Sequence, residues 1–123
     1  MRRIFITLFL FFCLSANAVE KKTNFSDKVF ESAKASGKTV VINSYEIWCG
    51  TCNKQTKILN QAEKEFQDIV FLSYEQSKNK DIAQKLDIKF WTTIVVYKGN
   101  DEVARIVGQT DKETIYSAIQ KGI

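Results

Sequence analysis

Trp48-Cys49-Gly50-Thr51-Cys52 is the stretch that decides the fold, because it places two thiols two residues apart where the hydrophobic pattern changes. Before it, Val40-Val41-Ile42 is a β-branched run typical of a buried strand. After it, apolar residues recur at helical spacing, namely Ile58, Leu59, Ala62 and Phe66. The pattern therefore predicts a cysteine pair at a corner between a strand and a helix.

A strand–helix corner suits thiol chemistry. The thiolate is the nucleophile in disulfide exchange, and the free backbone N–H groups and the positive dipole end of a helix stabilise it. We expect Cys49, at the helix start, to be the more acidic and more exposed thiol, and hence the nucleophile. Cys52 lies one turn further along, close enough to attack a mixed disulfide at Cys49 and release the partner.

At these residues the chain resembles the thioredoxin superfamily, whose signature is Trp-Cys-Gly-X-Cys between a strand and a helix. The resemblance covers nearly all of the chain after residue 24. It implies an α/β, thioredoxin-like three-layer sandwich, with a central mixed β-sheet and helices on both faces. It also implies a thiol:disulfide oxidoreductase that acts on protein thiols and disulfides. Because the cysteine pair holds the electrons, no metal or organic cofactor is expected.

The remaining pattern predicts alternating helices and strands in this family's order. Helices are predicted over residues 26–36, 49–66, 81–86 and after 110, and strands over 38–45, 69–74, 93–97 and 102–107. We expect the first strand to be central and the second to be buried on both faces. Lys98-Gly99-Asn100-Asp101 predicts a hairpin between the last two strands. Thr110 and Glu113 predict a capping box for the last helix.

The N-terminus has the pattern of a secretory signal peptide. Arg2 and Arg3 precede an apolar run over residues 4–14, and Ala16-Asn17-Ala18 is a small-x-small cleavage pattern. We predict a signal peptide over residues 1–18, a single domain over 19–123, and export to a bacterial periplasm. The run is shorter than the roughly 20 residues that span a bilayer, so we expect no stable membrane insertion after cleavage. An uncleaved anchor is the alternative.

Composition excludes several other classes of site. The formal net charge of +4 falls to +2 without Arg2 and Arg3, and no basic stripe is present, so we expect no nucleic-acid partner. The chain has no histidine, and a zinc site needs two more soft ligands than Cys49 and Cys52 supply. We expect a monomer without metal. The open alternative is a metal or iron–sulfur cluster shared by the cysteines of two chains.

The chain departs from the family in the loop that faces the cysteines. Thr92 stands where the family has a cis-proline, and the chain has no proline, so the Trp91–Thr92 peptide is either trans or held cis by its surroundings. In the family this loop holds an extended substrate segment, so Trp91, Thr92 and Thr93 are the expected partner-binding loop. The Thr92 hydroxyl or N–H is expected to bond the Cys49 sulfur or the partner. Trp91 is either a partner contact or a core side chain.

A second departure concerns the acid that takes the resolving cysteine's proton in many reductants of the family. Asn43 occupies the matching position, and asparagine cannot accept that proton. Glu46 is either a substitute acceptor or a solvated loop acid. The resemblance also implies that the pair Gly50-Thr51 tunes thiolate acidity and that Trp48 packs over the corner.

The sequence thus predicts an exported thiol:disulfide oxidoreductase with Cys49 and Cys52 as its catalytic residues. The compact domain lacks an inserted helical subdomain, which favours the reductant branch. A reductant in an oxidising compartment needs a membrane electron donor, and an oxidant needs an acceptor. The alternative is a non-catalytic binding or assembly module with a static Cys49–Cys52 disulfide, which loss of the proline and of the buried acid favours.

Overall fold

The computed structural model of the chain describes residues 23–123, and the predicted signal peptide lies outside the described residues. Its strands are β1 (Thr39–Tyr45), β2 (Ile69–Glu75), β3 (Thr93–Lys98) and β4 (Asp101–Val107). Its helices are α1 (Asp27–Ala35), α2 (Gly50–Glu65), the 3₁₀ turn η1 (Gln76–Lys78), α3 (Lys80–Lys85) and α4 (Lys112–Gln120). Within residues 23–123, no helix has both the length and the apolar character needed to cross a membrane.

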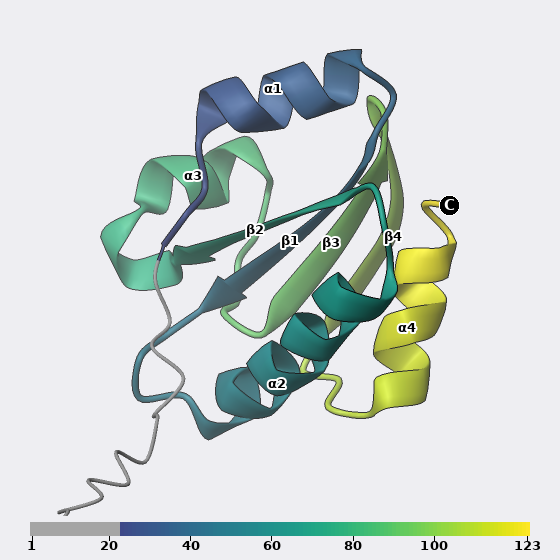
Figure 1. Cartoon of the computed structure of the whole chain (residues 1–123). Helices are drawn as coiled ribbons and strands as arrows, with labels where there is room; N and C mark the ends of the chain where they lie inside the picture. Colours follow the sequence, from purple (N-terminus) through teal and green to yellow (C-terminus); the bar gives the residue numbers. More distant parts are fainter. Residues whose placement is uncertain (1–22) are drawn as a thin grey trace, which may run out of the picture.

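The four strands form one mixed sheet in the order β2-β1-β3-β4 (Figure 1). β1 runs parallel to β2 and antiparallel to β3, and β3 pairs with β4 as an antiparallel hairpin. All seven residues of β1 are buried, which confirms its prediction as the central strand. Gly99 has a φ of +55°, which suits the tight turn that joins β3 and β4.

Helices cover both faces of the sheet, with α1 and α3 on one face and α2 and α4 on the other (Figure 1). Successive side chains of a strand point to opposite faces, so β1 contributes to two cores. Ile42 packs in the core under α1 and α3, whereas Val41 packs in the core under α2 and α4. The three-layer α/β fold is therefore confirmed.

The prediction that the second strand is buried on both faces is wrong. β2 lies at the edge of the sheet, and its first three residues are only partly buried. The chain covers part of this edge with its own backbone, because the N–H groups of Asn24 and Phe25 donate to Ser73 O at 2.9 and 3.0 Å. An apolar run therefore indicated a strand here without indicating its place in the sheet.

The N-cap of the last helix, α4, is Asp111, one residue after the predicted N-cap Thr110. Asp111 is the N-cap, with an extended backbone, and its Oδ2 accepts a 2.9 Å hydrogen bond from Thr114 N. The carboxylate of Asp111 binds the first turn, so the predicted Thr110–Glu113 capping box is wrong.

Candidate active site

The cysteine pair begins α2 and forms a disulfide with a Cα–Cα distance of 5.2 Å. Cys49 is the N-cap residue, and its Sγ accepts a 3.1 Å hydrogen bond from Cys52 N. Cys49 keeps 5% of its surface exposed and Cys52 keeps none, which is the order of exposure that the sequence predicted. When the disulfide opens, the same N–H and the helix dipole stabilise a thiolate at Cys49. Gly50 and Thr51 complete the first turn, the former exposed and the latter half-buried.

Two tryptophans meet beside the cysteine pair. Trp48 is 71% exposed and Trp91 41%, and their rings lie nearly edge to face with centroids 5.2 Å apart. Ile47 and Phe90, the neighbours of these tryptophans in the chain, are also exposed. We call Trp48, Phe90 and Trp91 the aromatic rim. Because Trp91 lies at the surface, the alternative that makes it a core side chain is wrong. Trp48, which was predicted to pack over the corner, contacts Trp91 and keeps most of its surface exposed.

Thr92 joins its loop to the interior through its backbone. All peptide bonds of the described residues are trans, the Trp91–Thr92 bond included, and Thr92 has a φ of +74°. Its N–H donates to Ser44 O at 2.9 Å, and its carbonyl oxygen accepts from Gly108 N at 3.0 Å. The alternative in which this N–H bonds the Cys49 sulfur or a partner is therefore wrong, and the alternative in which the Thr92 hydroxyl does so stays a prediction. A β-branched residue is strained at positive φ, so these backbone bonds hold it there.

Two side-chain hydroxyl groups hold the start of the Thr92 loop at Phe90. The hydroxyl groups of Ser44 and Thr93 both donate to Phe90 O, at 2.9 and 2.7 Å. Thr93 is only 2% exposed, so it anchors the loop from inside instead of facing a partner as predicted. Trp91 is thus left as the outward-facing member of the expected partner-binding loop.

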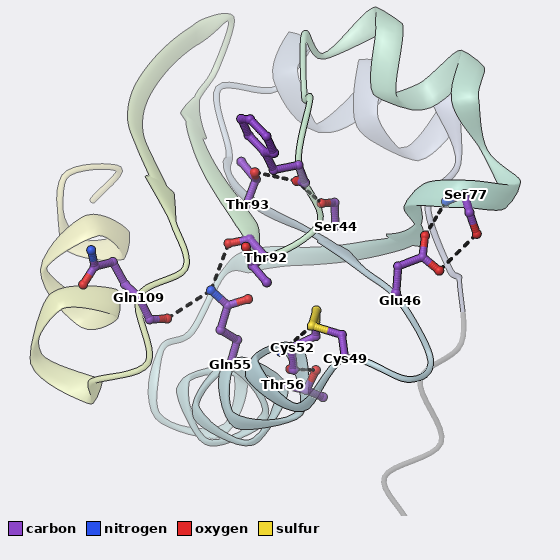
Figure 2. Close-up of a disulfide and its surroundings, with 11 residues drawn as sticks. Ser44, Glu46, Cys49, Cys52, Gln55, Thr56, Ser77, Thr92, Thr93 and Gln109 are labelled. Atoms are coloured by element: carbon purple, nitrogen blue, oxygen red, sulfur yellow. Dashed lines mark hydrogen bonds between the residues drawn. A yellow bond between two sulfur atoms is a disulfide. The ribbon is translucent and has the colours of Figure 1, made fainter.

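Gln55 is a site residue that the sequence reasoning missed. It is fully buried on α2, and its Nε2 donates to Thr92 O and to Gln109 O, both at 3.0 Å (Figure 2). The signal was present, since the buried residues of α2 are Cys52, Gln55, Leu59 and Ala62, at helical spacing. A polar residue in this register has to find partners inside the protein.

Asn43 and Glu46, the two residues considered in relation to the family's proton acceptor, occupy different places. Asn43 is buried within β1, in register with Ser73 of β2 and Ile94 of β3. Glu46 is only 3% exposed, so the prediction of a solvated loop acid is wrong. Its Oε1 accepts from Ser77 N at 2.6 Å and its Oε2 from Ser77 Oγ at 3.0 Å. Figure 2 shows this carboxylate directed toward Ser77 and away from the disulfide.

We expect Glu46→Gln to leave the pH dependence of disulfide exchange unchanged, because Ser77 already binds both carboxylate oxygens. The loss of charge-assisted hydrogen bonds should lower the free energy of unfolding by about 1–2 kcal/mol. Exchange rates across pH and denaturant unfolding measure the two effects. Ser77→Ala is the matched control, since it removes one of the same bonds. A pH profile that changes in Glu46→Gln alone identifies Glu46 as a proton acceptor.

A disulfide whose first sulfur caps a helix, at the end of the central strand of an α/β sandwich, defines a dithiol–disulfide exchange site. Residues 16–121 match the family model for thioredoxin, and the chain therefore belongs to the thioredoxin family. Its activity is that of a thiol:disulfide oxidoreductase.

Relatives support this assignment in sequence and in structure. The chain is 34% identical to thioredoxin-2 of Saccharomyces cerevisiae over 64% of its length and 77% of the relative's. It is 31% identical to a thioredoxin of Chlamydia pneumoniae over 78% and 93%. The crystal structure of Trxlp from Edwardsiella tarda matches with a TM-score of 0.73 and 26% identity, over 77% of this chain and 94% of that one.

Proposed function

We propose that the chain is an exported thiol:disulfide oxidoreductase that reduces disulfides of partner proteins. The observation that carries the proposal is the 3.1 Å hydrogen bond from Cys52 N to Cys49 Sγ at the start of α2. It stabilises negative charge on the sulfur of Cys49, the cysteine of the pair that keeps some exposed surface. The aromatic rim beside Cys49 provides an apolar surface on which a protein partner can dock.

In the proposed reaction the Cys49 thiolate attacks one sulfur of the partner's disulfide. The partner's other sulfur leaves as a thiolate and takes up a proton, which gives a mixed disulfide. Cys52 then loses its proton, attacks the Cys49 sulfur and closes the Cys49–Cys52 disulfide. The partner leaves with two thiols, so it has gained two electrons from the chain and two protons. One proton balances the loss from Cys52, and the other comes from solvent, which took up the Cys49 proton when the thiolate formed.

The N-terminal sequence supports the cellular compartment that we propose for this reaction. The basic residues, apolar run and cleavage pattern within residues 2–18 favour a bacterial periplasm, where disulfides reoxidise. A reductant in that compartment has to be reduced again, so we propose a membrane dithiol donor as a second partner. The proposed working form is a monomer without metal or organic cofactor.

We expect the disulfide to undergo a reversible transition when the purified protein is equilibrated with graded thiol/disulfide buffers. Trp48 and Trp91 contact each other beside the pair, so their fluorescence should report the transition. A midpoint near about −270 mV supports a reductant, and one near about −120 mV indicates an oxidant. A disulfide that stays closed in strong reductant under native conditions contradicts exchange activity and supports the static binding module.

A further inference from the structure

We propose that Gln55 is a positioning residue. Its side-chain carbonyl oxygen would accept a hydrogen bond from the S–H of Cys52 when the disulfide is reduced, while its side-chain NH₂ group binds the Thr92 loop. The inference rests on the proposed function, because it assigns Gln55 a role in the same redox cycle. It links the resolving thiol of α2 to the loop that carries Trp91.

The orientation of the Gln55 carboxamide follows from its partners. Both N–H groups of Nε2 point to carbonyl oxygens, one on Thr92 and one on Gln109. A flipped carboxamide would place Oε1 against the same two carbonyl oxygens, and neither can donate a hydrogen bond. Nε2 therefore stays on the loop side and Oε1 on the other side of the group.

The Oε1 atom of Gln55 is buried and has no hydrogen-bond partner among residues 23–123. A buried acceptor without a partner costs about 1–3 kcal/mol, so such a group suggests a donor that appears in another state of the protein. Cys52 lies three residues earlier on the same buried face of α2, a spacing at which helical side chains are neighbours. In Figure 2 Oε1 is directed to the side on which the cysteine pair lies.

Reduction creates the missing donor. A partner dithiol passes two electrons and two protons to the chain and becomes a disulfide, while the Cys49–Cys52 bond breaks and both sulfurs become thiols. In the oxidised protein Cys52 has no S–H, and in the reduced protein it has one inside a fully buried site. The side-chain carbonyl of Gln55 would accept a hydrogen bond from this S–H group and so stabilise the reduced form.

The test compares full-length wild type with Gln55→Met, which keeps the side-chain length and removes the acceptor. The bonds to Thr92 and Gln109 are not made by the cysteines, so their loss should affect both redox states similarly. We expect the equilibrium constant for reduction by glutathione to fall about threefold and the pKa of the Cys52 thiol to fall. Gln61→Met, on the exposed face of α2, is the matched control and should change neither.

A measurement on the wild type covers the case in which Gln55→Met folds poorly. The ¹³C resonance of the Gln55 side-chain carbonyl should shift when the wild type is reduced. In Cys52→Ala, which has neither the disulfide nor the Cys52 S–H, the resonance should lie near its position in the oxidised wild type. An unchanged carbonyl resonance, or an unchanged equilibrium constant in Gln55→Met, overturns the inference and leaves Gln55 as a loop anchor only. A wild type that shows reversible reduction preserves the proposed function whatever Gln55 does. A wild type that is never reduced overturns both.

Discussion

Cys49→Ser is expected to reduce the rate of disulfide exchange to the uncatalysed level of small thiols. A serine hydroxyl does not ionise near neutral pH, so the hydrogen bond from Cys52 N and the dipole of α2 would have no anion to stabilise. The remaining thiol, Cys52, is fully buried and cannot reach a protein disulfide. The measurement is the rate at which the reduced protein opens a disulfide in a test protein.

The matched variant is Cys52→Ser, which removes the second step instead of the first. Cys49 can still attack, but no thiol remains to resolve the mixed disulfide. We therefore expect Cys52→Ser to accumulate covalent complexes with partner proteins that a reductant releases, and Cys49→Ser to accumulate none. Activity that survives in Cys49→Ser, or the absence of trapped partners in Cys52→Ser, contradicts the assigned roles.

Thr92→Pro, which restores the residue type usual in the family, is expected to destabilise this protein by about 3 kcal/mol or more. Proline requires a φ near −65°, whereas Thr92 has a φ of +74°. Proline also lacks the N–H that donates to Ser44 O. The loop would have to move, and Trp91 would leave its contact with Trp48. Denaturant unfolding and tryptophan fluorescence measure the two effects.

Thr92→Gly separates backbone conformation from the side chain. Glycine adopts positive φ without strain and keeps the N–H, so its free energy of unfolding should lie within about 1 kcal/mol of the parent. If Thr92→Pro is as stable as Thr92→Gly, the bonds to Ser44 and Gln55 are not what holds this loop.

The sequence by itself determined the fold and the reacting pair. The CxxC at the end of an apolar β-type run, followed by a helical repeat, is a local pattern, and the central strand and α2 appear where it predicted them. The hairpin was predictable from the turn residues around Gly99, because this turn signal is also a local pattern. Hydrophobic period, turn chemistry and helix start are properties of neighbouring residues, so a single sequence is sufficient to read them.

Tertiary structure alone decided the supporting contacts of the site. Sequence reasoning left the Trp91–Thr92 bond undecided, left Trp91 between core and surface, and left Glu46 between a proton acceptor and a solvated loop acid. The answers depend on partners far along the chain: Glu46 binds Ser77, 31 residues away, and Gln55 binds Gln109, 54 residues away. Such contacts exist only after the strands and helices have packed, because packing determines which buried polar groups meet.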